Sequence, residues 1–96
     1  MKLVIEANAE AEAMHAIKHY EACRDGLGLD FSRELDAGFE WILQHPLAWP
    51  VFDEGARRCQ LRRFPYVVVY RVMTDHITVL AVMHQHREPG YWMRLP

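Results

Sequence analysis

Arginine side chains form the densest group in this sequence that could do chemistry. Arg57, Arg58, Arg62 and Arg63 lead directly into the apolar segment 64–70. Arginine binds carboxylate and phosphate groups through paired hydrogen bonds, so the run could hold an anionic ligand or an acidic peptide. Because side chains alternate along a strand, Arg58 and Arg62 are expected to project together from one face. The alternative is a solvated strand face whose charges block edge-to-edge pairing, and the spacing favours neither interpretation.

Histidines supply a second set of candidates. His15 and His19 have the i, i+4 spacing of a metal-binding helix, but no third ligand follows at a recognised spacing, which favours two solvated side chains. His84 and His86 are expected on one face of the last strand, near Glu88. They could transfer protons near neutral pH, although an ordered structural pair is the favoured interpretation. No phosphate loop, catalytic triad or carboxylate pair is present, so we predict neither a cofactor nor a metal.

The length of 96 residues predicts a single domain that spans residues 1–96. The formal net charge of −2 conceals a split between the two halves. Residues 1–46 hold four Lys/Arg against nine Asp/Glu, a net of −5, and residues 47–96 hold seven Arg against four Asp/Glu, a net of +3. No apolar run approaches the roughly 20 residues of a membrane span, so we expect a cytoplasmic protein. Two cysteines without metal or redox spacing are expected to be reduced and partly buried.

The elements that must position these residues follow from periodicity. We expect a short strand at residues 2–6, then a helix that begins at the N-cap Asn8 and ends near residue 24. Gly26 and Gly28 should end that helix, and Asp30 should cap a second helix that runs to about residue 45. This second helix has one apolar stripe, formed by Phe31, Leu35, Phe39 and Ile42. Two helices joined by a short turn form an antiparallel hairpin.

The second half of the chain is expected to be β-structure. After a loop at 46–56, we expect strands at 57–63, 66–73 and 76–85. The continuous apolar run at 67–69 predicts a central strand with both faces covered. The expected fold is therefore α+β with the order β-α-α-β-β-β, in which the helical hairpin covers one face of the sheet. Tyr91 and Trp92 in the tail should pack on this body, or else leave a groove for a partner.

Several of these features together resemble the RelE/ParE superfamily, the toxins of bacterial type II toxin–antitoxin modules. The resemblance covers nearly the whole chain and rests on the element order and on short motifs. These motifs are Tyr20 followed by Gly-Leu-Gly at 26–28, Phe31, the arginine pair before Phe-Pro-Tyr at 64–66, the Tyr-x-Val-x-Tyr strand, and His84, Arg87, Pro89, Tyr91 and Trp92. The resemblance implies a plasmid-stabilisation or stress-response toxin that a cognate antitoxin neutralises.

The mechanism divides within this superfamily. RelE-like members cut mRNA on the ribosome, and by resemblance Arg58, His84, Arg87 and Tyr91 would be the catalytic set here. ParE-like members inhibit DNA gyrase without intrinsic catalysis. This interpretation is favoured, because Gln60, Val67 and Gln85 occupy positions where the nuclease pattern has charges. An inactive orphan that only binds a peptide is the third hypothesis. For partner binding we predict Arg58, Arg62, Arg63 and Trp92.

Overall fold

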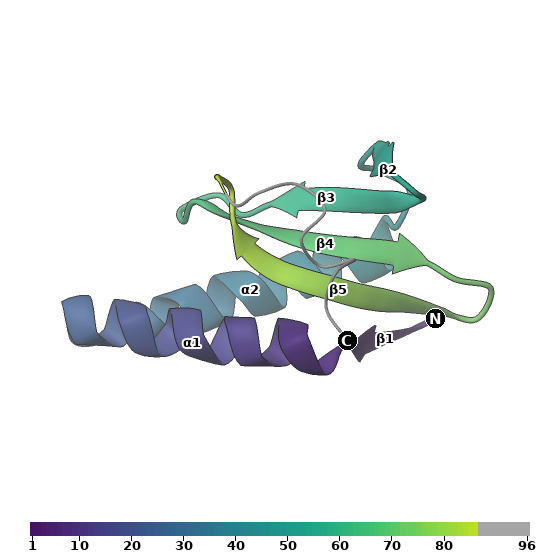
Figure 1. Ribbon diagram of the computed structural model, residues 1–96. Helices are drawn as coiled ribbons and strands as arrows, with labels where there is room; N and C mark the ends of the chain where they lie inside the picture. The colour runs from purple at the N-terminus through teal and green to yellow at the C-terminus, as the bar shows by residue number, and fades with distance from the viewer. Residues whose placement is uncertain (87–96) are drawn as a thin grey trace.

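Five strands form one open sheet, which the computed structural model describes within residues 1–86 of the chain. Across the sheet the order is β1-β5-β4-β3-β2, with β1 parallel to β5 and all other neighbours antiparallel. The α+β class is confirmed, with β1 at an edge (Figure 1). In chain order the strands are β1 (Lys2–Ile5), β2 (Val51–Asp53), β3 (Ala56–Gln60), β4 (Tyr66–Val72) and β5 (His76–His84).

Two antiparallel helices, α1 (Ala7–Cys23) and α2 (Leu27–Gln44), cover one face of this sheet (Figure 1). The predicted stripe of α2 is confirmed at Phe31, Leu35 and Ile42, which are at most 4% exposed. These side chains pack on the helix-facing residues of β3, β4 and β5 in one apolar cluster. Burial of this stripe stabilises α2, because a helix gains most of its stability in a protein from packing one face.

The start of α2 differs from the prediction that Asp30 caps it and that Gly28 ends the preceding helix. The helix begins at Leu27, and its N-cap is Gly26 with a φ of 87°. The carboxylate of Glu21, on α1, accepts hydrogen bonds from the backbone N–H groups of Gly26 and Gly28 at 3.0 Å. A side chain from the preceding helix therefore satisfies two N–H groups that a local cap would otherwise bind, and Asp30 lies within the first turn.

The start of α1 also differs from the prediction, since Glu6 and not Asn8 is the N-cap. Strand β1 ends at Ile5, so within residues 1–86 the neighbouring edge of β5 has no strand partner beyond Val79. A bulge in β5 lies opposite β4 at this point, and the Asn8 amide donates to the Leu80 carbonyl at 2.8 Å. Asn8 is thus recruited to satisfy a strand backbone group that β1 does not reach.

Strand β2 is an addition to the predicted strands, because residues 46–56 were expected to be a loop. Val51 pairs with Arg57, and Asp53 pairs with Ala56 across a tight connection. Glu54 and Gly55 make this connection with φ angles of 44° and 80°, in the left-handed region that glycine adopts without steric cost. Three residues after a proline are too few to show a strand periodicity, which is why the sequence pattern missed β2.

Strand β4 is the centre of the sheet, as the apolar run at 67–69 predicted. Val67, Val68, Val69 and Tyr70 are each at most 1% exposed. Val68 and Tyr70 belong to the cluster under the helices, whereas Val67 and Val69 belong to a separate cluster on the opposite face. The fold therefore depends on apolar residues on both faces of this strand.

Replacing Val68 with Asp should unfold the protein. The carboxylate would be buried without a charged partner, at a cost of several kcal/mol, on the order of the whole stability of a small domain. Circular dichroism and urea denaturation measure the effect. Val4→Asp is the matched control, because Val4 is 40% exposed on the edge strand β1. A cooperative, soluble Val68→Asp variant would contradict the central position of β4.

Replacing Gly28 with Ala should destabilise the helical hairpin. A Cβ atom at Gly28 would lie 2.7 Å from the Ile17 carbonyl oxygen, a backbone atom that cannot move alone. Gly38→Ala in the same helix is the control, because its nearest atom is the flexible Leu61 Cδ2 at 3.2 Å. We expect Gly28→Ala to be less stable than Gly38→Ala by about 1–3 kcal/mol in urea denaturation. Equal stabilities would show that the two helices separate readily at this contact.

Candidate functional site

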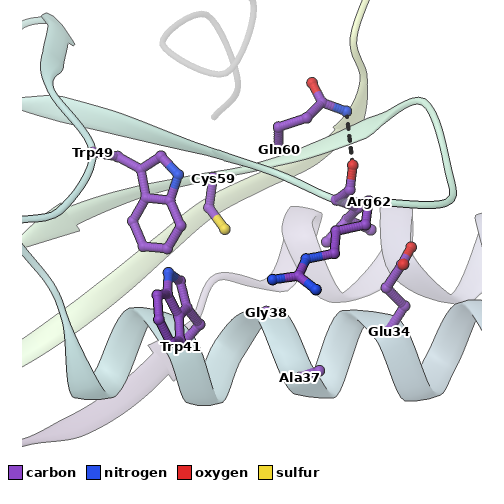
Figure 2. A pocket seen from close by; sticks show the side chains of 9 residues that line it. Glu34, Ala37, Gly38, Trp41, Trp49, Cys59, Gln60 and Arg62 are labelled. Atoms are coloured by element: carbon purple, nitrogen blue, oxygen red, sulfur yellow. Dashed lines mark hydrogen bonds between the residues drawn. The ribbon is translucent and has the colours of Figure 1, made fainter.

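A groove of about 420 Å³ opens between α2 and the end of β3. In Figure 2 the side chains of Trp41 and Trp49 stand on one side of it, and the Arg62 guanidinium points towards the helix at Gly38. The groove has a size typical of ligand-binding clefts and combines aromatic, small and charged side chains. Its lining residues are Glu34, Ala37, Gly38, Trp41, Trp49, Cys59, Gln60, Leu61 and Arg62.

The tryptophan wall of this groove is fixed by the sheet. The Tyr70 hydroxyl donates to the Pro46 carbonyl at 2.8 Å, and the Arg57 guanidinium donates to the Trp49 carbonyl. Burial raises the pKa of Tyr70 to about 12, which keeps the phenol protonated and able to donate. The Trp49 ring meets the Trp41 ring at a centroid distance of 6.3 Å and an angle of 79°. Two partly buried hydrogen bonds therefore hold the segment after α2 in place.

Gln60 shapes the other end of the groove. Its side-chain amide donates to the carbonyls of Leu61 at 3.2 Å and Tyr66 at 3.1 Å, on the two sides of the turn that joins β3 to β4. The Leu61 N–H also donates to the Tyr66 carbonyl at 2.9 Å. Gln60 therefore serves the structure of this turn, at a position where the nuclease pattern has a charged residue.

Arg62 and Arg63, next to each other in this turn, have different surroundings. The Arg63 guanidinium pairs with Asp30 at 3.4 Å, and its backbone N–H donates to the two Glu34 carboxylate oxygens at 2.9 and 3.1 Å. Arg62 is exposed and makes no ion pair within residues 1–86. Because α2 already holds Arg63, the groove presents Arg62 as its cationic group.

Arg58 and Arg62 do not project from one face, so this prediction is wrong. Strand β3 ends at Gln60, and its alternation does not continue to Arg62. Arg58 lies on the face opposite the helices, where its guanidinium carbon is 5.6 Å from the centroid of the Phe52 ring. The two arginines therefore belong to different surfaces of the molecule.

Two of the candidate histidines, His15 and His84, line a second hollow of about 400 Å³ between α1 and the ends of β4 and β5. It joins His15 of one predicted pair to His84 of the other, together with Glu12 and Tyr66. Burial and the neighbouring Glu12 carboxylate both raise the pKa of Tyr66. The proximity of these residues could not be predicted from the sequence, because it results from the packing of α1 on β5.

Of the remaining candidates, His19 is exposed and points its Nε2 towards the Cys23 sulfur at 3.9 Å. The His86 ring lies 5.4 Å from the His84 ring, but the two do not share a strand face as predicted, because β5 ends at His84 and His86 lies in the turn that follows. Arg87, Tyr91 and Trp92 lie outside the described residues. In the described part of the chain no group of three or more His, Cys, Asp or Glu side chains could hold a metal ion.

Trp41 is the functional candidate that the sequence analysis missed. It lies outside the buried stripe of α2, and 49% of its surface is exposed. A large aromatic side chain off the buried face of a helix is itself a signal, since tryptophan is enriched at binding surfaces. Tertiary structure was needed to place it opposite Trp49.

Comparisons with known proteins agree with this architecture. A solved structure of the chromosomal ParDE TA system from P. aeruginosa is similar in fold, with a TM-score of 0.68 and 21% sequence identity over 88% of this chain and 95% of that one. The family described as the ParE toxin of the type II toxin-antitoxin system, parDE, matches residues 4–89. The fold is thus that of a toxin–antitoxin component, and the chain belongs to the ParE toxin family. No curated protein matches the sequence.

The resemblance predicted a type II toxin of the ParE family, and the family match confirms this prediction. None of the helices within residues 1–86 combines the length and apolar character needed to cross a membrane.

The two cysteines should differ strongly in reactivity. Cys23 is exposed, contrary to the expectation that both are partly buried, whereas Cys59 under the groove is 3% exposed and burial raises its pKa to about 11. A thiol reagent at about pH 8 should modify Cys23 rapidly and Cys59 only after denaturant is added, because the thiolate is the reactive form. Cys23→Ser should abolish the rapid phase. Equal rates for both thiols would show that the groove floor opens in solution.

Proposed function

We propose that this ParE-family protein inhibits DNA gyrase in the cytoplasm and that a cognate antitoxin neutralises it. The match of the ParE family to residues 4–89 carries the proposal. Inhibition of this kind requires a protein surface and no catalytic residues in the toxin. The proposal therefore concerns binding to a large enzyme.

The surroundings of the residues at nuclease positions support this choice over mRNA cleavage. The Gln60 side-chain amide donates hydrogen bonds to three backbone carbonyls around the turn that joins β3 to β4, and Val67 is 1% exposed within an apolar cluster. Arg58 lies against the Phe52 ring. Cleavage of a phosphodiester needs cations and proton donors gathered at the scissile phosphate. The described residues at these positions are instead engaged in structural contacts.

The distribution of charge supports an antitoxin with acidic side chains. Residues 47–96 carry a net charge of +3, and Arg62 and Arg63 lie on an exposed turn of this half. Opposite charge on a partner speeds the encounter and selects its orientation. An antitoxin segment rich in Asp or Glu would meet that requirement.

Purified toxin incubated with gyrase, ATP and plasmid should convert supercoiled DNA to the linear form, because a poisoned gyrase retains the cleaved strands. An agarose gel after protease treatment measures the linear product. Toxin with plasmid alone is the control and should leave the DNA intact. Normal supercoiling at a large excess of toxin, together with mRNA cuts at the ribosomal A site in toe-printing, would instead establish RelE-like cleavage. Inactivity in both assays and unchanged growth on expression would leave only the peptide-binding hypothesis.

A further inference from the structure

We propose that the groove between α2 and β3 binds a protein segment that presents an apolar side chain to Trp41 and Trp49 and a carboxylate to Arg62. The inference rests on the proposed function, since the antitoxin is the partner expected to supply this segment. It adds the location of the contact and the side chains that make it.

The shape of the groove comes from two small residues of α2. Ala37 is exposed, and Gly38 has no side chain, so the helix surface is low where it faces the end of β3. Among the described residues, a Cβ atom at Gly38 would meet only Leu61 Cδ2, at 3.2 Å. The resulting volume of about 420 Å³ can accept a large side chain from outside.

The aromatic wall supplies the apolar contact. Trp41 is 49% exposed, and Leu47, on the segment that follows α2, is 66% exposed. Trp49 is already positioned by the hydrogen bonds from Tyr70 and Arg57 to this segment, so a partner need not order its backbone. Preorganised tryptophan in a cleft is a frequent source of affinity, because its large surface loses water with little loss of conformational freedom.

Charge selects the chemistry of the occupant. Arg62 makes no ion pair within the described residues, whereas the Glu34 carboxylate accepts two hydrogen bonds from the Arg63 N–H group. The groove therefore offers a guanidinium to its occupant, and guanidinium binds carboxylate through paired hydrogen bonds. A partner segment with an Asp or Glu close to an apolar residue can contact the tryptophans and the Arg62 guanidinium at the same time.

The proposal is tested with two separate variants, one that fills the groove and one that removes its positive charge. Ala37→Phe should occupy the cavity from an exposed helix position, and Arg62→Ala should remove the cation. Ala11→Phe is the matched control for bulk, because Ala11 is exposed on α1 and lines the other hollow. Arg24→Ala is the control for net charge, because Arg24 is an exposed arginine remote in sequence from the groove. Thermal unfolding of each variant establishes that it is folded.

Binding is measured by titration with the purified cognate antitoxin. Isothermal titration calorimetry gives the dissociation constant of each variant and leaves Trp92, which we predict to contact the partner, unchanged. We expect Ala37→Phe and Arg62→Ala each to weaken binding by at least about tenfold, and both controls to bind like the parent protein.

Four other outcomes are informative. Unchanged affinity in both groove variants would overturn the groove assignment and leave the proposed function intact. Failure of the antitoxin to bind the parent protein would instead contradict the proposed function. If Ala37→Phe weakens binding but Arg62→Ala does not, the carboxylate requirement is wrong. A dimer of the toxin alone that Ala37→Phe abolishes would assign the groove to a second copy and overturn the proposal.

Discussion

Burial of β4 on both faces is the constraint on which the rest of the structure depends. Its four residues from Val67 to Tyr70 are each at most 1% exposed and divide between two apolar clusters. A strand covered in this way must lie inside a sheet, so β3 and β5 flank it and β1 and β2 are left at the edges. The helical hairpin can then cover only one face (Figure 1). The groove exists where α2 crosses the end of β3, and its position is a consequence of this layering.

Hydrogen bonds between the elements fix the positions of the two walls of the groove. The Tyr70 hydroxyl, at the end of the buried run, holds the Pro46 carbonyl and with it the segment that carries Trp49. On the other side, Glu34 of α2 holds the turn after β3 through the Arg63 N–H group. The two walls of the groove are thus attached to α2 and to the sheet by hydrogen bonds of 2.8–3.1 Å. Such attachment limits the reorganisation that binding would otherwise require.

Apolar spacing in the sequence predicted the buried faces of the helices and strands. It could not predict features that depend on contacts between those elements. The α2 stripe at Phe31, Leu35 and Ile42 and the central apolar strand follow from spacing alone, and both are confirmed. The Asp30 cap is wrong because α2 begins earlier, at Leu27, where Glu21 reaches from the other helix to bind the N–H groups of Gly26 and Gly28. The common face of the arginines is wrong because the strand ends sooner than its pattern suggests, at a glutamine whose amide binds the following turn. Within the candidate site, the groove could not be foreseen, since Trp41 lies outside every apolar pattern.

The same contacts explain why a basic half of the chain does not make a basic face in its described part. Three of the four arginines of the run each contact a different neighbour: Arg57 the Trp49 carbonyl, Arg58 the Phe52 ring, and Arg63 Asp30. Nucleic-acid surfaces gather several cations along one face, so that many phosphates are neutralised together. Here the run instead contributes a single guanidinium beside two tryptophans. Aromatic area with one selective charge is the composition of a protein-binding hot spot, which is the kind of surface that a toxin acting through protein partners requires.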